Sequence, residues 1–490
     1  MTATARPAVA VLWLRRDIRL HDHPALAAAL EAADAVVPAY VLDPRLLAGP
    51  RSSANRTWFL LGSLRELATD LAARGAPLVV RTGRPELVIP ALADEAGARD
   101  VFATRDVSPF ARDRDRAVGA ALAAAGRHLH LRRGLLVAEP EDVHADDGRP
   151  VTVFTPFSRR WAAVPRRALV PPPDAIPSLP AGTLAGEALP EPPPPTADPA
   201  LLPVPGEAAA RERLASWVAS AALPAYADGR NRLDVDGTSR LSADLKFGTL
   251  SPLEVLLAAE GPGDGRRAFV SELCWREFYA HVLWHFPHVV RGAYRPAYDA
   301  IPWADDPAGL AAWREGRTGY PVVDAAMRQL AAGGWMHNRA RMIVASFLAK
   351  DLLVDWRRGE DHFMAHLVDG DVAANNGGWQ WTAGTGTDAA PYFRVFNPVS
   401  QGRRFDPEGA YVRRWVPELA RVPDAYVHEP RAMPQDVQAA SGCVIGRDYP
   451  APIIDHAAAR DRALAAYAVA KGGDARPGRR GPGVPEAGEP

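Results

Sequence analysis

The chain has 490 residues, of which 48% are apolar, and a formal net charge of −1, which argues neither for nor against a nucleic-acid partner. Two cysteines, Cys274 and Cys443, exclude a disulfide framework and favour a reducing compartment, so we expect a cytoplasmic protein. No apolar run approaches the ~20 residues of a membrane span, and no signal peptide is apparent, so no membrane partner is expected.

Residues 1–135 alternate short apolar runs with helical patterns. The expected strands are Ala8–Leu14, Val36–Leu42, Leu78–Arg81, Asp100–Ala103 and His128–Leu131, and the expected helices include Asn55–Ala73 and Glu86–Ala96. This alternation predicts an α/β domain with a doubly wound parallel sheet. The turn after the first strand, RRDIRLHDHP, has no glycine, so the phosphate-binding fingerprint of a dinucleotide fold is absent. A flavoprotein oxidoreductase is therefore disfavoured.

Two charges of this first domain stand at positions that suit a ligand. Arg56 opens a helix, and Asp106 follows the fourth strand. Such residues are most often ordinary surface charges. Ligands of open α/β sheets, however, bind beyond the carboxyl ends of the strands, which is where Asp106 lies.

Residues 136–206 form a connection to a second domain. Thirteen prolines lie between Pro171 and Pro205, so this part is expected to run extended over the surface. The motif TPFSRRW near its start is expected to dock against a domain. Residues 207–471 have helical patterns and predict an all-α domain, whereas residues 472–490 are rich in glycine and proline and are expected to be a disordered tail.

Inside the helical part, the stretch Gly334–Pro398 has the most unusual composition. Asn375 and Asn376 compete with the backbone for hydrogen bonds in a regular helix, and the glycine pair that follows them lets a backbone approach a flat partner. Both features indicate a bound planar cofactor. A helix over Trp335–Lys350 would place polar and polarisable side chains on one face, which could then line a cavity. The alternative is a buried helix in which two polar residues have hydrogen-bond partners.

Two further segments carry polar patterns. Asp236–Pro252 offers the hydroxyls of Thr238, Ser239 and Ser242 at an expected helix start, where amide groups bind phosphate readily; an ordinary N-cap is the alternative. On a helix over Ser271–Phe286, the side chains of Glu272 and Trp275 share one face. A carboxylate beside an indole is unusual for the buried face of a helix and indicates a binding site. The alternative is a surface ion pair beside a half-buried tryptophan.

The motifs GWMHNRARM, DGDVAANNGGWQW and GTDAAPYFRVFNP resemble those of the photolyase/cryptochrome family, in particular class I photolyases that repair cyclobutane pyrimidine dimers. The resemblance runs from VLWLRRDIRL to YPAPIIDH, over most of the chain. It implies a deoxyribodipyrimidine photolyase, a carbon-carbon lyase that uses light and reduced FAD. The implied partner is UV-damaged DNA in the bacterial nucleoid, and we expect a monomer that needs no metal.

The same resemblance implies roles for individual residues. The FAD residues would be Tyr226, Thr238, Ser239, Arg240, Leu241, Ser242, Arg341, Asp369, Asp371 and Asn375. In this set Arg341 and Asp369 would form an ion pair beside the isoalloxazine ring, Asp371 would lie at its polar edge, and Asn375 would face the flavin N5. The lesion would contact Glu272, Trp275, Asn338, Met342 and Trp381. An electron relay would run outward through Trp379, Trp356 and Trp303; each of these tryptophans taken alone would be read as core packing.

A second chromophore is expected in the N-terminal domain. Folate types carry an Asn-Glu pair after the fourth strand, where this chain has Arg105-Asp106-Val107. Arg56, Asp106 and Lys246 match the set that resembles the 8-hydroxy-5-deazaflavin types. A carboxylate accepts from a ring N–H, and two cations suit an ionised hydroxyl. We therefore expect 8-hydroxy-5-deazaflavin, with 5,10-methenyltetrahydrofolate as the alternative.

The expected DNA surface lies around Arg394, Arg403 and Arg404, where five arginines stand against two acidic residues; a solvated charged face is the alternative. Two other functions use the same scaffold. A cryptochrome-type blue-light photoreceptor is disfavoured by Met342, by Asn375 and by the short tail. Repair of the (6-4) photoproduct needs histidines at the lesion; His337 is present, but Met342 stands where the second is expected.

Overall fold

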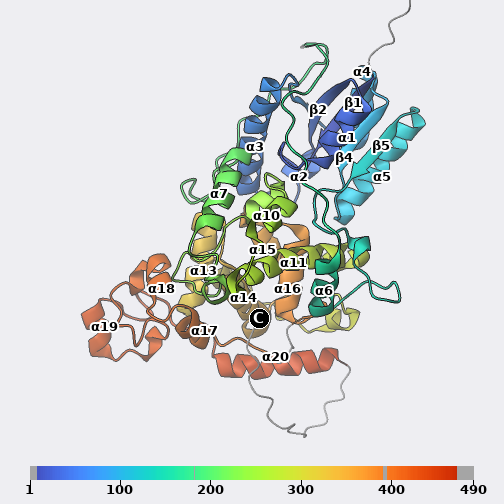
Figure 1. The fold of residues 1–490 in the computed structure, drawn as a ribbon. Helices are drawn as coiled ribbons and strands as arrows, with labels where there is room; N and C mark the ends of the chain where they lie inside the picture. The colour runs from blue at the N-terminus through green and yellow to red at the C-terminus, as the bar shows by residue number, and fades with distance from the viewer. Residues whose placement is uncertain (1–7, 181, 390–393, 472–490) are drawn as a thin grey trace, which may run out of the picture.

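The computed structural model describes residues 8–180, 182–389 and 394–471, so the expected tail at 472–490 lies outside the described residues. An α/β part stands above a larger helical part (Figure 1). The five strands are β1 (Val9–Leu14), β2 (Ala35–Leu42), β3 (Val79–Thr82), β4 (Asp100–Thr104) and β5 (His128–Arg132). They pair in parallel in the order β3-β2-β1-β4-β5, which confirms the predicted sheet.

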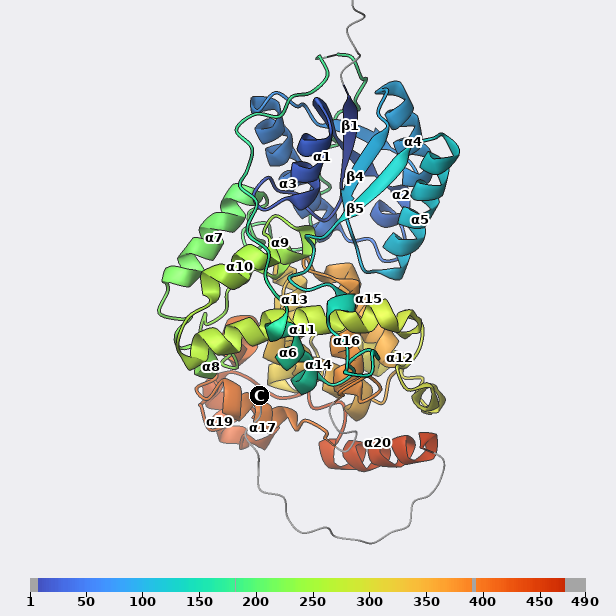
Figure 2. The same cartoon turned by 45° about the vertical axis from the view of Figure 1, so that its right-hand side comes forward.

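Helices cover both faces of this sheet. Helices α1 (Pro24–Ala32) and α3 (Ala54–Ala73) lie on one side, and α4 (Pro85–Glu95) and α5 (Pro109–Ala124) lie on the other (Figure 2). The strands are apolar without alternation because both faces are covered. Within β1, Leu12 belongs to the core beneath α1 and α3, whereas Val11 and Trp13 belong to the core beneath α4 and α5.

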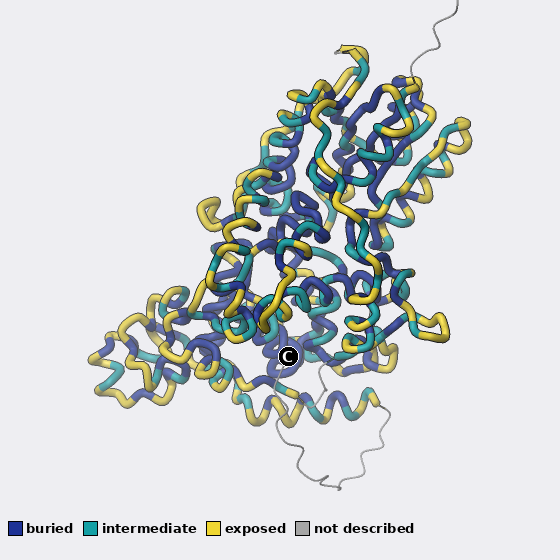
Figure 3. The backbone as a smooth tube through the Cα atoms, viewed as in Figure 1, coloured by how far each residue is buried: buried dark blue, intermediate teal, exposed yellow. Residues whose placement is uncertain are grey.

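The second part of the chain is helical, as predicted. Its main helices are α7 (Glu207–Ala219), α8 (Tyr226–Gly229), α9 (Ser242–Phe247), α10 (Pro252–Ala259), α11 (Asp264–His285), α12 (Pro307–Arg314), α13 (Pro321–Gly333), α14 (Asn338–Ser346), α15 (Trp356–His366), α16 (Val372–Ala383), α17 (Pro398–Phe405), α18 (Ala410–Trp415), α19 (Gln435–Ser441) and α20 (His456–Ala470). A buried centre runs through this part and is enclosed by exposed turns (Figure 3). None of the described helices combines the length and the apolarity needed to cross a membrane.

Residues 136–206 are less extended than the prolines suggest. Their first half holds α6 (Phe154–Ala163), whose side chains Phe157 and Trp161 are buried in one core with α11. The motif TPFSRRW therefore docks against the helical domain, as expected. In the proline-rich half, Ile176 and Leu202 are also buried, against the side of the sheet that α1 and α3 cover. The connection thus contributes to the packing of both parts, because single apolar side chains of an extended chain still find pockets.

The helix expected over Trp335–Lys350 begins three residues later. Gly334, with a φ of 61°, ends α13 in the left-handed conformation that glycine adopts without strain. His337 then caps α14, its ring accepting a hydrogen bond from the backbone N–H of Arg339. The last turn, Phe347–Asp351, is π-helical. The prediction was wrong at its start because a ring nitrogen supplies the cap and excludes Trp335 from the helix.

Candidate functional site

The five expected lesion residues lie on three neighbouring helices, α11, α14 and α16. Glu272 and Trp275 lie on α11, Asn338 and Met342 lie on α14, and Trp381 lies near the end of α16. Helix α16 packs against both α11 and α14. Asn338 is exposed and the other four are partly exposed, unlike the buried side chains on the other faces of these helices. The structure thus packs together the three helices that carry these residues, and each of the five side chains is at least partly exposed.

Glu272 has a partner that the sequence did not suggest. Its Oε1 lies 2.5 Å from Nη1 of Arg230, which follows α8. Burial raises the pKa of the Glu272 carboxyl, and the nearby positive charge of Arg230 opposes that rise. Arg230 thereby orients the carboxyl group and partly offsets the effect of its burial.

The expected ion pair between Arg341 and Asp369 is present, with Nη2 and Oδ2 2.7 Å apart. The other carboxylate oxygen of Asp369 is buried and has no hydrogen-bond partner among the described residues. A methyl group added at Gly378, on α16, would meet no atom within 4 Å, which shows open space beside that helix. An unsatisfied buried acceptor is costly unless a further group pairs with it. These features fit a polar, flat molecule bound between the helices.

Asn375 and Asn376 lie inside the regular helix α16, contrary to the expectation that they would disturb it. Their amide groups donate away from the helix, from Nδ2 of Asn375 to the carbonyl of Glu360 (3.1 Å) and from Nδ2 of Asn376 to the carbonyl of Val289 (3.0 Å). These partners remove the competition with the backbone. One of the two N–H groups of the Asn375 amide is used in this bond, and its oxygen remains as an acceptor for a bound molecule.

The expected phosphate-binding segment lies where α8 and α9 approach α11. Tyr226 opens α8 and is buried, and Leu241 is buried ahead of α9. Arg240 has a φ of 54°, and its guanidinium lies 5.0 Å from the centre of the Trp335 ring. Helix α9 begins at Ser242, as expected, and the hydroxyls of Thr238 and Ser239 precede it on the loop.

The three relay tryptophans belong to one core cluster. Trp379 and Trp356 are 2% and 1% exposed, while Trp303 is partly exposed at the edge of the cluster. Burial therefore separates Trp303 from the other two but does not order Trp379 and Trp356, and the relay stays a prediction. A further tryptophan that the sequence did not single out, Trp313, lies edge-on to Trp379 with ring centres 6.1 Å apart.

A cavity of about 490 Å³ lies between the α/β part and the helical part. It is within the usual size of a small-molecule site. It is lined by the three residues expected to bind the second, light-harvesting chromophore: Arg56, Asp106 and Lys246. It stands beyond the carboxyl ends of β1, β2 and β4, at the reversal of strand order where open α/β sheets bind ligands.

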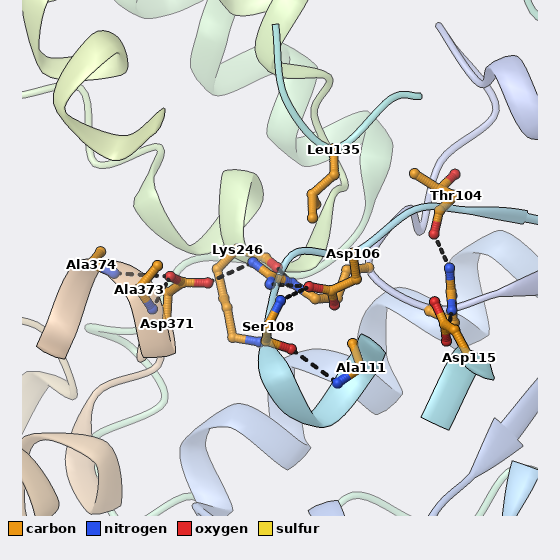
Figure 4. Close-up of polar contacts among 12 residues, drawn as sticks. Thr104, Asp106, Ser108, Ala111, Asp115, Leu135, Lys246, Asp371, Ala373 and Ala374 are labelled. Atoms are coloured by element: carbon orange, nitrogen blue, oxygen red, sulfur yellow. Dashed lines mark hydrogen bonds and ion pairs between the residues drawn. The ribbon is translucent and has the colours of Figure 1, made fainter. Parts of the chain in front are cut away.

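The polar groups of this cavity form one network. Asp106 and Asp371 approach from opposite sides, with Lys246 between them (Figure 4). Arg16 lies 2.6 Å from Asp371 and 3.6 Å from Asp106. Asp371, expected at the flavin edge, therefore lines this cavity and also caps α16 by accepting from Ala373 and Ala374. The sequence signal for Arg16 was the glycine-free, charged turn after β1.

Burial changes the ionisation of these groups. Burial first, and then the charge of Arg16, lower the pKa of Lys246 to about 7. Burial also lowers the pKa of Arg56 to about 10, and its guanidinium donates to the backbone carbonyls of Met364 and Leu367. Burial alone would raise the pKa of Asp106, but Arg16 and Arg114 hold it below its usual value. A carboxylate, a buried guanidinium and an amine whose charge is disfavoured by burial thus face the same cavity.

The expected DNA arginines lie on and before α17. Arg394, Arg403 and Arg404 are all exposed. Arg403 is ion-paired with Glu429 at 3.2 Å, and the nearby Arg413 is ion-paired with Asp424 at 2.6 Å. These acidic partners come from later segments, so the local positive charge is smaller than the sequence around α17 suggests.

Comparison with known proteins agrees with both parts of the structure. Residues 10–178 match the family model for DNA photolyase, and residues 269–469 match the model for the FAD binding domain of DNA photolyase. A deoxyribodipyrimidine photo-lyase of Streptomyces griseus is 44% identical over 93% of this chain and 98% of its own length. The chain belongs to the DNA photolyase family.

Two solved structures share the fold of this photolyase-family chain. A bacterial class III photolyase from Agrobacterium tumefaciens is 39% identical, with a TM-score of 0.91, over 96% of this chain and 99% of its own. A cryptochrome from Synechocystis is 31% identical, with a TM-score of 0.87, over 94% of this chain and 100% of its own. The predicted fold, the enzyme family and the FAD-binding domain are therefore confirmed.

Proposed function

We propose that this photolyase repairs cyclobutane pyrimidine dimers in DNA, with light as the energy source. The observation that carries the proposal is the packing of α11 and α14 against α16, the helix that follows the Arg341–Asp369 ion pair. These three helices carry the expected lesion residues Glu272, Trp275, Asn338, Met342 and Trp381. Reduced FAD would supply the electron when excited by light. The dimer would accept it, its two cyclobutane bonds would break, and the electron would return.

The protein would contribute binding, orientation and electrostatics. The FAD would be held by the ten residues expected from the sequence, with the buried Asp369 oxygen and the open space at Gly378 in support. Arg341 would favour an anionic reduced ring, and the free oxygen of the Asn375 amide would accept from a protonated N5. Glu272, held by Arg230, would accept a hydrogen bond from the pyrimidine rings between walls formed by Trp275 and Trp381.

DNA would approach this face with the lesion flipped out of the duplex, which costs a few kcal/mol and less for a damaged pair. The arginines around α17 would hold the phosphates, although Arg403 would first leave Glu429.

Repair of the (6-4) photoproduct is disfavoured by the state of His337. Its ring is buried, and Nδ1 accepts from the backbone of Arg339. Burial first, and then the charges of Arg339 and Arg341, lower its pKa to about 4. A neutral ring used as a helix cap is a poor acid at the lesion. The presence of Met342 and Asn375 disfavours a cryptochrome-type photoreceptor function, although a cryptochrome shares the fold.

We further propose that the interdomain cavity binds 8-hydroxy-5-deazaflavin as an antenna, and that the chain is of class I. Asp106 would accept from a ring N–H, while Arg56 and Lys246 would face an ionised hydroxyl. The alternative chromophore, 5,10-methenyltetrahydrofolate, lacks such a hydroxyl. The shared fold with a class III photolyase leaves the choice of chromophore to these side chains.

The deciding experiment illuminates the purified, reduced protein with an oligonucleotide that contains a thymine dimer and follows the recovery of base absorbance in the ultraviolet. Recovery in the light and none in the dark is the expected result. No recovery with reduced FAD bound would reject dimer repair. For the antenna, expression in a host that makes deazaflavin and chromatography of the released chromophores is expected to recover deazaflavin; recovery of folate would reject that assignment alone.

A further inference from the structure

The ring of Phe154 covers one face of the Trp275 indole. Their ring centres are 3.6 Å apart and their planes are 6° from parallel. This is closer than the roughly 4.5–7 Å usual for aromatic pairs, so the two rings overlap face to face. Both side chains are only partly buried. Phe278 lies edge-on to the same indole and Tyr279 lies tilted against it, with ring centres 5.6 and 5.7 Å away. Phe154 is thus the ring that stacks on Trp275, and the indole still remains partly exposed.

The backbone at Phe154 is held by the loop that follows α16. Phe154 is the first residue of α6, and its backbone N–H donates to Oδ2 of Asp388 at 2.9 Å. The hydroxyl of Thr387 also donates to the carbonyl of Thr152, just before α6. Asp388 has a φ of 44°, a left-handed conformation that is unfavourable for a residue with a side chain. The surrounding contacts compensate for that strain.

This loop continues directly from α16, which ends at Ala383 and carries Trp381. Trp381, expected at one wall of the lesion pocket, and Asp388 therefore lie on the same stretch of chain. Asp388 bonds the backbone of Phe154, whose ring stacks on Trp275, the expected opposite wall. The linkage joins α16, the connection segment and α11, three parts that are far apart in the sequence.

We propose that Phe154 is a positioning residue for lesion recognition, and that Asp388 positions Phe154. The proposal rests on the proposed function of Trp275 as a pocket wall. Phe154 fixes the plane of the indole before DNA arrives and leaves one face for a flipped pyrimidine. A wall that is already immobile spares the ordering of a side chain on binding, which corresponds to about a two- to tenfold gain in affinity.

The test compares Phe154→Leu with Phe157→Leu, the same substitution on the same helix. Phe157 is buried and its ring contacts Phe278 and His281. Phe278 in turn lies edge-on to Trp275, so this control changes a side chain that is one contact removed from the indole. Dissociation constants are measured for a duplex with one thymine dimer and for the matched undamaged duplex, with FAD bound. We expect Phe154→Leu to weaken binding to the damaged duplex about two- to tenfold and to leave the undamaged duplex unchanged. Phe154→Tyr, which keeps the flat ring, is expected to retain discrimination.

Asp388 is tested with a second pair. Asp388→Asn keeps an oxygen acceptor and tolerates the positive φ, so discrimination is expected to persist. Asp388→Ala removes the acceptor and is expected to lower discrimination as Phe154→Leu does. Equal discrimination in wild type and Phe154→Leu, or an equal loss in Phe157→Leu, would overturn the proposal. If the wild type itself binds both duplexes equally, the proposed function fails instead.

Discussion

Nη2 of Arg16 lies 2.6 Å from Oδ2 of Asp371, so an arginine beyond β1 is ion-paired with the residue that caps α16. The two side chains are only 22% and 19% exposed. Helix α16 carries Asn375, Trp379 and Trp381, so the α/β part holds the start of the helix that lines the proposed flavin and lesion sites. The cavity and the candidate active site are thereby joined by one ion pair.

Removal of Arg16 is expected to loosen this connection. Arg16→Gln should lower the free energy of unfolding by about 1.5–3 kcal/mol, the usual loss for a hydrogen bond to a charged group. The measurement is the thermal unfolding midpoint together with the FAD retained after gel filtration. Arg45→Gln is the matched control, because Arg45 pairs with Asp43 and Glu86 within its own domain. An Arg16 variant as stable and as flavin-loaded as the control would contradict this connection.

Lys246 predicts a pH dependence of stability. Its pKa in the folded protein is about 7, below the usual 10.5, because burial disfavours its charge. The unfolded chain thus binds more protons between pH 7 and 10.5, and stability contributed by this group rises with pH across that window. We therefore expect Lys246→Met to stabilise the chromophore-free protein. The gain in the free energy of unfolding should be larger at about pH 6 than at about pH 9, by about 1–2 kcal/mol. Denaturant titrations at the two pH values provide the check, and a constant difference would refute the assignment.

Glu272 is expected to matter for repair and not for flavin binding. Glu272→Ala removes a charged hydrogen-bond partner worth about 1.5–3 kcal/mol and leaves Arg230 without its carboxylate. The repair yield per absorbed photon at saturating DNA should fall, with the FAD content unchanged. Glu272→Gln, which keeps an acceptor oxygen, should lie between the alanine variant and the wild type. An unchanged yield in the alanine variant would count against a role at the lesion.

Trp379→Phe or Trp303→Phe should block photoreduction of oxidised FAD, because each removes an easily oxidised indole from the expected relay. Repair by chemically reduced enzyme should persist in both. Absorbance of the flavin during illumination with an external reductant measures the first effect. Trp415→Phe, which removes a tryptophan at the edge of the same core cluster, is the control. Normal photoreduction in both variants would reject the assignment of these tryptophans to an electron relay.

The arginines of α17 should set the salt dependence of DNA binding. Arg403→Ala combined with Arg404→Ala is expected to reduce the slope of log affinity against log salt by about 0.9 for each phosphate that the protein no longer neutralises. Glu429→Gln is the opposite change, since it releases Arg403 from its ion pair and should strengthen binding. Binding isotherms at several salt concentrations decide the matter. A slope that neither variant alters would place the DNA surface elsewhere.

Much of the fold followed from local pattern. All five strands lie within one residue of their expected bounds, because buried parallel strands are short apolar runs between helical segments. Asp106 lies in the cavity because it follows β4 at the carboxyl edge of the sheet, whereas Arg56 and Lys246, which the family resemblance suggested, reach the same cavity from α3 and α9. The start of α14 was missed, because capping by the ring of His337 is unusual.

The sequence by itself determined the order of the elements, the two kinds of domain and the residue types of the sites. Only the tertiary structure decided which charges and rings lie against one another. Arg16 and Asp371 are 355 residues apart, Arg230 meets Glu272 across two helices, and Phe154 reaches Trp275 from the connection segment. Such pairs carry no local signal, because packing of whole helices and a shared buried space bring them together. The sequence thus suggested candidate residues such as Glu272 and Trp275, and the fold supplied the partners that hold them.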